Sequence, residues 1–193
     1  MEIITLPVGA LETNCYILSL PERNDCIVID PGDDYEKIIA AADGKTISAV
    51  LLTHGHYDHT GALSSFTCPV YMHPADEMML TDAAWGAMGD PSFVPRKANV
   101  RYVMEGTSLS LAGMEIAVLH TPGHTPGCVC YQLENALFTG DTLFHHGYGR
   151  TDLPGGNFRE LVSSLRRLYR LDESLPFYPG HGPHSTIGKE RGH

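Results

Sequence analysis

Apolar residues in this chain gather in short runs, separated by polar segments that are rich in glycine and proline. The runs contain many β-branched and aliphatic residues and are too short for helices, so we expect them to form strands. They cover residues 2–6, 14–20, 26–30, 47–53, 69–73, 99–104, 108–111, 115–120, 127–133, 136–140 and 176–180.

Helical spacing of apolar residues occurs between some of these runs. The clearest case is residues 157–171, where Asn157 is a favourable helix cap and the apolar stripe consists of Phe158, Leu161, Val162, Leu165 and Leu168. Further helices are expected at 33–42 and 74–84, with a short turn after His59. This mixture predicts an α/β fold with two sheets and helices outside them. Because no repeat or linker divides the chain, we expect a single domain over residues 1–193.

The charge balance narrows the class of partner. Lys and Arg number 13 against 23 Asp and Glu, which gives a formal net charge of −10. This sign argues against nucleic acid and against an anionic membrane surface. The first residues lack the basic segment of a signal peptide, and no apolar stretch approaches the ~18 residues of a membrane span. We therefore expect a cytoplasmic protein that acts on a small molecule, and we assign no oligomeric state.

The 5 cysteines are an odd number, and most of them lie inside apolar runs. This placement is typical of buried, reduced thiols. Cys128 and Cys130 have the spacing of one strand face and could form a metal pair, but two small core residues are the better interpretation.

The segment "LLTHGHYDHTG", residues 51–61, concentrates four donors behind an apolar run. A strand would point His54, His56 and Asp58 to one face and His59 to the other, and a helix would scatter all four. The segment must therefore curl. Four donors would saturate a single tetrahedral ion, so this crowding indicates more than one metal.

Three more donors follow the ends of later strand-like runs. His124 comes after residues 115–120, Asp141 after 136–140 and His181 after 176–180. Residues at strand ends are held by the sheet while their loops bend toward a common centre. Together with the first cluster they make five imidazoles and two carboxylates, which suit two divalent cations with one bridging aspartate. Nitrogen and oxygen donors favour zinc, with iron or manganese as alternatives, and a shared water position would suit hydrolysis.

The remaining histidines carry weaker signals. His73, His145, His146, His184 and His193 are expected to be structural, since a lone histidine is seldom a ligand. His120 precedes "TPGH" and could hydrogen-bond one of the metal ligands.

The motifs "THGHYDHTG", "HTPGHTPG", "FTGDTLF" and "YPGHGPHSTIGKE" resemble the successive signatures of the metallo-β-lactamase superfamily. Within it the chain most resembles short bacterial hydroxyacylglutathione hydrolases of the glyoxalase II type, which carry a "GRTD" segment like residues 149–152. The resemblance implies an αββα sandwich of two mixed sheets and a binuclear site. It assigns His54, His56 and His124 to one metal, Asp58, His59 and His181 to the other, and Asp141 to the bridge.

The resemblance also implies a metal-dependent thioesterase acting on an S-acylglutathione through a hydroxide held by the metals, with Asp58 and Asp141 as catalytic residues. The longer relatives bind glutathione partly through an additional helical domain, and nothing after His181 supplies those contacts here. Arg150 is the plausible cationic counterpart, with an ion pair to Asp152 as the competing interpretation. Residues 82–99 contain Trp85 and are expected either to cover the metal mouth or to pack Trp85 into the core.

Other functions remain open. A persulfide dioxygenase of the same fold would use one Fe(II) held by His54 or His56 with His124 and Asp141. A lactonase or β-lactamase is a weaker alternative, and a non-catalytic metal-binding protein is a further one. Metal content and thioester turnover distinguish these hypotheses.

Overall fold

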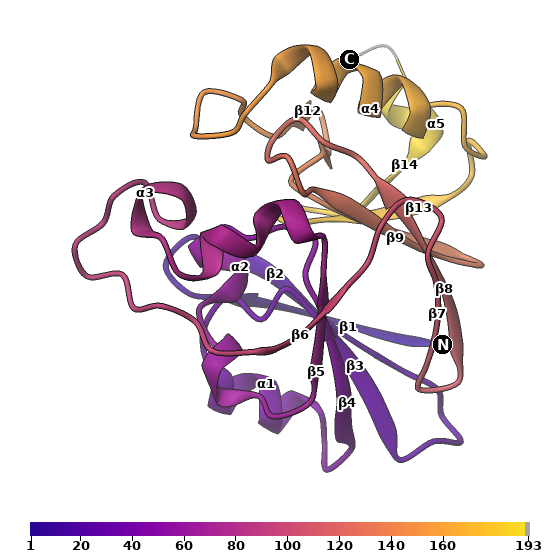
Figure 1. The fold of residues 1–193 in the computed structure, drawn as a ribbon. Coiled ribbons are helices and arrows are strands. Elements are labelled where there is room, and N and C mark those ends of the chain that lie inside the picture. Colours follow the sequence, from indigo (N-terminus) through magenta and orange to yellow (C-terminus); the bar gives the residue numbers. More distant parts are fainter. Residues whose placement is uncertain (192–193) are drawn as a thin grey trace.

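The computed structural model describes residues 1–191 and contains two six-stranded sheets (Figure 1). His193, expected to be structural, lies outside the described residues. The first sheet has the order β1-β2-β3-β4-β5-β6. Its strands are β1 (Glu2–Val8), β2 (Thr13–Ser19), β3 (Asp25–Ile29), β4 (Thr46–Leu51), β5 (Pro69–Met72) and β6 (Asn99–Tyr102). The first three are antiparallel and β3 to β6 are parallel, so the sheet is mixed.

The second sheet has the order β14-β13-β10-β9-β8-β7. Its strands are β7 (Ser108–Leu111), β8 (Met114–His120), β9 (Val129–Leu133), β10 (Ala136–Gly140), β13 (Pro176–Pro179) and β14 (Ser185–Thr186). Only the β10 and β13 pair is parallel, so this sheet is mixed as well. A small hairpin of β11 (Leu143–Phe144) and β12 (Gly147–Tyr148) follows β10.

The two sheets face each other across the central core. Leu18, Ile27 and Leu51 of the first sheet belong to the same buried cluster as Val118 and Phe138 of the second. Burial of these apolar faces from both sides is the main stabilising contribution to such a sandwich.

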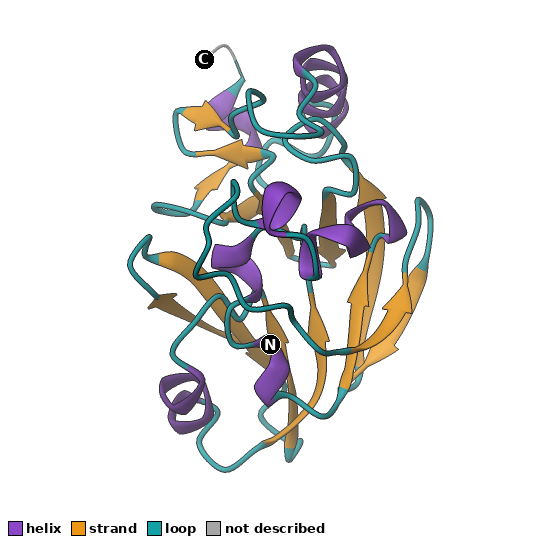
Figure 2. Cartoon of the chain, turned by 60° about the vertical axis from the view of Figure 1, so that its left-hand side comes forward, coloured by secondary structure: helices purple, strands orange, loops and turns teal. Residues whose placement is uncertain are grey.

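Helices cover the outer faces of both sheets, as Figures 1 and 2 show. The helical elements are α1 (Tyr35–Ala41), α2 (Tyr57–Thr60), η1 (Leu63–Ser65), η2 (Pro74–Leu80), α3 (Ala83–Gly86), α4 (Phe158–Leu168) and α5 (Ile187–Glu190). Ile38 of α1 and Leu63 of η1 pack into a cluster on the first sheet, and Leu165 of α4 and Ile187 of α5 pack onto the second. The predicted αββα sandwich is confirmed.

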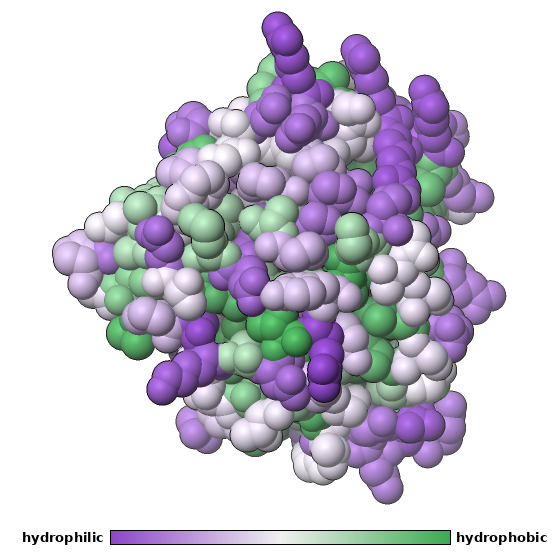
Figure 3. Space-filling model, viewed as in Figure 1, coloured by the Kyte–Doolittle hydropathy of each residue, from purple (hydrophilic) through white to green (hydrophobic). Residues whose placement is uncertain are grey.

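Helix α4 forms for the reasons that its sequence gives. The Asn157 side chain accepts hydrogen bonds from the backbone N–H groups of Arg159 and Glu160, which caps the first turn. Leu161, Leu165 and Leu168 are buried, while Phe158 at the start of the stripe is exposed. The outer surface over α4 is hydrophilic (Figure 3).

The helix expected at 74–84 is divided in two. A 3₁₀ helix ends at Leu80, and α3 begins at Ala83. The division follows from Asp82, whose carboxylate accepts a hydrogen bond from the N–H of Ala84 and caps a new helix. Of the described residues, no helix is both long and apolar enough to cross a membrane. The five cysteines are free and all but Cys68 are buried.

Candidate metal centre

The seven predicted donors lie together because of the direction of four strands. Strand β9 runs antiparallel to both β8 and β10, and β13 runs parallel to β10, so the carboxyl ends of β8, β10 and β13 share one edge of the second sheet. The loops after these strands carry His124, Asp141 and His181. The loop after β4, in the first sheet, brings His54 and His56, and the short helix α2 adds Asp58 and His59.

The donors form overlapping groups. The first consists of His54, His56 and His124, each offering one nitrogen within 4.8 Å of the others. Within it, Nδ1 of His56 lies 2.9 Å from Nε2 of His124. Two imidazole nitrogens this close must share either a proton or a metal cation. A common metal ion would bind the lone pairs of both nitrogens.

The second group consists of Asp58, His59 and His181. Oδ2 of Asp58 lies 3.4 Å from Nε2 of His59 and 3.2 Å from Nε2 of His181. Asp141 stands between the two groups, with Oδ1 3.4 Å from Nε2 of His59 and Oδ2 3.5 Å from Nε2 of His124. A carboxylate in this place can contact a cation in each group.

The buried polar atoms test whether cations fit here. Nε2 of His54, His56 and His59 and Oδ1 of Asp141 are buried without a hydrogen-bond partner among the described residues. Such atoms are rare in native proteins because each one costs desolvation free energy. Gly180 packs directly against this site and leaves no room for a side chain there. A Cβ at this position would lie 2.1 Å from Oδ1 of Asp141 and 2.7 Å from Cε1 of His59. The donor set and its free space fit divalent metal ions.

The pKa shifts show where the donors favour positive charge. Asp58 and Asp141 outweigh burial and raise the pKa of His59 and His181, so these two imidazoles would exchange a proton for a metal cation. The other shifts match the ligand forms directly. Burial and the neighbouring imidazoles lower the pKa of His54 well below its usual value and bring that of His56 to about 3. Burial alone would raise the pKa of the Asp58 and Asp141 carboxyls, but the surrounding histidines, His59 foremost, outweigh it and lower both. Neutral imidazoles and ionised carboxylates are the forms that bind metals.

Three of the candidate ligand histidines have a partner on Nδ1, on the side of the ring away from the other donors. Oδ2 of Asp30 lies 2.9 Å from Nδ1 of His59, and Oγ1 of Thr53 lies 3.2 Å from Nδ1 of His54. Nδ1 of His124 donates to the backbone carbonyl of Arg150 at 2.7 Å. Fixing each Nδ1 in this way turns Nε2 toward the centre and selects the tautomer. Sequence patterns alone did not identify these partners, although Asp30 directly follows β3 and so lies at a strand end, as several of the donors do.

Asp76 is another functional candidate that the sequence analysis missed. Its buried carboxylate accepts hydrogen bonds from the N–H of Gly55, the hydroxyl of Thr125 and the N–H of Gly127. It therefore joins the loop of His54 and His56 to the loop of His124. No local sequence pattern around Asp76 predicts that it connects these two loops.

The sequence matches the Metallo-beta-lactamase superfamily over residues 8–181. The chain belongs to this superfamily. An uncharacterized protein of Mycobacterium tuberculosis is 39% identical, covering 99% of this chain and 95% of its own length. The hydroxyacylglutathione hydrolase GloC of Haemophilus influenzae is 34% identical with the same coverage of 99% and 95%.

Three solved structures match at least 98% of this chain. The B3 metallo-β-lactamase BLEG-1 has a TM-score of 0.90 at 34% identity and covers 100% of this chain and 97% of its own. TTHA1623 in a di-iron-bound form has a TM-score of 0.87 at 37% identity, covering 98% and 97%. ETHE1 from Myxococcus xanthus has a TM-score of 0.82 at 28% identity, covering 100% and 83%.

In this member of the metallo-β-lactamase superfamily a cavity of about 380 Å³ opens above the donors. Its floor includes His56, Asp58, His124, Asp141 and His181. Its walls are largely apolar and aromatic and include Leu11, Tyr57, Met88, Phe144, Tyr148 and Leu153. A mostly apolar cavity above convergent polar groups is the usual form of a small-molecule site.

Arg150 lines this cavity, but its guanidinium is already paired. Nε and Nη2 each lie 2.7 Å from an oxygen of Asp152, and both side chains are exposed. The ion pair that we weighed against substrate binding is therefore present, and Arg150 also contributes its backbone carbonyl to His124.

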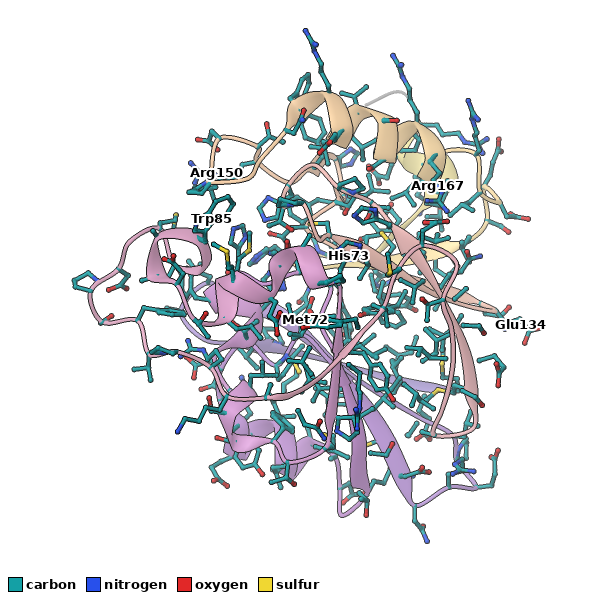
Figure 4. All side chains as sticks on the ribbon, viewed as in Figure 1. Met72, His73, Trp85, Glu134, Arg150 and Arg167 are labelled. Atoms are coloured by element: carbon teal, nitrogen blue, oxygen red, sulfur yellow. The ribbon has the colours of Figure 1, made fainter. Side chains whose placement is uncertain are left out.

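His120 has partners other than the candidate ligands. Its Nε2 lies 2.9 Å from the carbonyl of Pro126, and its ring stacks on His73, labelled in Figure 4, at 4.2 Å. His184 stacks on Tyr178. His145 and His146 form the β11–β12 turn and lie beside the buried Glu190, in a group separate from the seven donors.

The segment 82–99 contributes to the mouth of the cavity through Gly86 and Met88. Trp85 lies outside the three core clusters of the described residues. Its ring packs against the loop of residues 151–156, so closely that a Cβ on Gly155 would lie 3.0 Å from Cζ3. Figure 4 shows Trp85 beneath the loop that carries Arg150.

Proposed function

We propose that this protein is a binuclear metallohydrolase that cleaves acyl thioesters of the S-acylglutathione type. The observation that supports it best is the position of Asp141 between two complete donor groups at the floor of an apolar cavity. Members of the superfamily are typically metal-dependent hydrolases, and GloC, at 34% identity, is described as a hydroxyacylglutathione hydrolase.

His54, His56 and His124 would hold one cation and Asp58, His59 and His181 the other, with Asp141 shared. Two divalent cations would supply a Lewis acid for a thioester carbonyl and a lowered pKa for water. We propose zinc as the metal, while iron and manganese also suit these donors. TTHA1623, a structural relative, is described in a di-iron-bound form.

The chain's own residues account for the remaining requirements. The Thr13 hydroxyl donates to Oδ2 of Asp58 at 2.9 Å and fixes this carboxylate at the cavity floor, where it can accept a proton from water. Tyr57 and Phe144 exclude bulk water from the walls, which strengthens electrostatic interactions within. A thiolate leaves without an acid partner because its conjugate acid has a pKa of about 8.5.

The experiment combines metal analysis of freshly purified protein with a spectrophotometric assay of S-lactoylglutathione hydrolysis. We expect about two ions per chain from the two donor groups. Asp141→Ala should lose both metal content and turnover, because Asp141 is shared. A wild-type protein with two ions that hydrolyses no thioester would refute the proposal, as would an Asp141→Ala variant that retains both.

A persulfide dioxygenase is the second candidate. It is favoured by the close approach of two imidazoles and one carboxylate that could hold a single Fe(II): Nε2 of His124 lies 2.9 Å from Nδ1 of His56 and 3.5 Å from Oδ2 of Asp141. One iron per chain with oxygen consumption on glutathione persulfide would support it against the hydrolase. Hydrolysis of a β-lactam in the same preparation would instead favour the activity named for BLEG-1.

A further inference from the structure

A second cavity adjoins the metal centre. It has a volume of about 310 Å³ and shares Leu11, Tyr57 and Asp58 with the cavity above the donors. A substrate whose reacting carbonyl lies at the metals can therefore extend into it past Tyr57. Arg96, from the segment 82–99, is the one cationic residue on its wall among the described residues.

The Arg96 side chain is half-buried and has no carboxylate partner within residues 1–191. Nη1 donates to the carbonyl of Val94 at 2.5 Å, and the guanidinium lies 5.1 Å from the centre of the Phe93 ring. Nε is buried without an acceptor among the described residues. The guanidinium groups of Arg23, Arg150, Arg167 and Arg191 are each paired with a carboxylate. The other arginines without an ion pair among the described residues are all exposed: Arg101, Arg159, Arg166 and Arg170.

A cation in this position is costly unless an anion joins it. Burial lowers the pKa of Arg96, and Asp33, the other charged residue on the outer wall, opposes this only weakly and lies beyond ion-pair distance. Packing on Phe93 and one bond to a carbonyl would not require a delocalised charge with five donors. A carboxylate is the group whose geometry matches those donors.

We propose that Arg96 binds a carboxylate of the substrate in this second cavity and so determines specificity. The inference rests on the proposed thioesterase function. The carboxylate can belong to the acyl group or to the thiol carrier, because either end of a thioester can face the cavity. Arg150 then keeps its pairing with Asp152, and Arg96 supplies the unpaired cation.

Four thioesters separate these sources: the glutaryl and pentanoyl esters of N-acetylcysteine and of N-acetylcysteamine. They differ only in the presence of a carboxylate on the acyl side, the carrier side, both or neither. Arg96→Met should lower kcat/KM by roughly 10- to 100-fold for the substrates whose carboxylate Arg96 binds, either on the acyl side or on the carrier side. This is the effect expected for loss of a charged hydrogen bond. The ester without carboxylates should change less than about twofold.

Two variants control for charge and for structure. Arg101→Met removes the same charge from an exposed position on β6 and should leave all four rates unchanged. Asp33→Asn removes the anion that opposes a bound carboxylate and should raise kcat/KM for the carboxylate substrates only. If Arg96→Met slows all four esters equally, or lowers the melting temperature without changing the preference, Arg96 is structural and the proposal is wrong.

A binding measurement keeps this test independent of the proposed function. If the wild-type protein hydrolyses neither S-lactoylglutathione nor any of the four esters, the thioesterase proposal fails. The metal-loaded protein is then titrated calorimetrically with N-acetylcysteine and with glutarate. At least tenfold weaker binding of either ligand to Arg96→Met than to Arg101→Met supports the carboxylate site, and equal affinities overturn it.

Discussion

Asp30 has an unfavourable backbone conformation, and its side chain orients the candidate ligand His59. Its φ of 51° lies in the left-handed region, which Asp and Asn tolerate better than most residues. Its two carboxylate oxygens accept from the N–H and the hydroxyl of Thr53, and Oδ2 also faces Nδ1 of His59. This bond network holds the backbone in place and leaves Nε2 of His59 directed at the carboxylates of Asp58 and Asp141.

Asp30→Asn should therefore weaken metal binding while keeping the backbone conformation. If the amide oxygen faces the N–H of Thr53, the NH₂ group meets Nδ1 of His59 and removes its acceptor. Loss of such an orienting partner reduces metal affinity by about 10- to 100-fold. Competition with a chromophoric chelator measures this, and an unchanged affinity would show that Asp30 does not orient the ligand.

At the same scale, the sequence predicts the candidate donors better than their surroundings. His54, His124, Asp141 and His181 each follow an apolar run and stand beside Gly, Pro or Thr. Strands that run in the same direction have their carboxyl ends at the same end of the sheet, so residues placed in this way can be expected to meet. The partner of His120 is a carbonyl, and carbonyl partners leave no trace in residue type.

Glu190 links two elements that sequence patterns do not reveal. From the end of α5, its buried carboxylate accepts from the hydroxyl of Ser185, from Nδ1 of His145 and from the N–H of His146. These bonds attach the β11–β12 turn to the C-terminal helix. They outweigh the effect of burial and bring the pKa of Glu190 to about 2.

Glu190→Gln should lower the free energy of unfolding by about 2 to 4 kcal/mol at pH 7, since a buried charged acceptor of three hydrogen bonds is lost. A depressed folded pKa stabilises the protein above the unfolded value, so the difference should shrink as the pH falls from about 4.5 toward about 2. Urea unfolding of metal-free protein at pH 7 and pH 3 measures both. Glu134→Gln, at an exposed site (Figure 4), is the control. A constant difference across this pH range would contradict the assignment.

Trp85 attaches α3 and the segment after it to the loop of residues 151–156, which lies across the cavity mouth. Trp85→Ala should release Met88 from the mouth and raise KM by roughly 3- to 10-fold, with little change in kcat, for loss of about 1 kcal/mol of contact. Tyr102→Ala, which removes an exposed ring on β6, should leave KM unchanged. A large fall in melting temperature at constant KM would instead assign Trp85 to the fold.

Helices and strands were predictable where the apolar pattern extends over several residues. Every strand expected from an apolar run is present, and α4 begins after the expected Asn157 cap. The two-residue strands β11, β12 and β14 and the four-residue α5 were not foreseen, because segments this short contain only about one period of the strand or helix pattern and so show no repeat. Tertiary bonds such as those of Glu190 fix them instead.

For the whole molecule, the metal centre lies between the halves of the sandwich, so metals should stabilise the complete fold. The donors come from loops of both sheets, and only the folded chain brings them together. A site saturated at 1,000 times its Kd contributes about 4 kcal/mol, and 1 kcal/mol changes the Tm of a chain of this size by about 2 to 4 °C. Chelation should thus lower Tm by at least about 10 °C by calorimetry, and added zinc should restore it. An unchanged Tm after verified metal loss would contradict this.

The candidate ligands and the cavity walls occupy different parts of the architecture. The ligands follow strand ends and are fixed from behind by Asp30 and Asp76, whereas the walls come from separate loops around residues 9–11, 82–99 and 144–153. Lineages can therefore diverge in substrate by replacing wall residues while the reaction centre is inherited intact. The same separation marks these loops as the place for a laboratory library that seeks a new substrate, and the strand ends as positions that such a library should leave untouched.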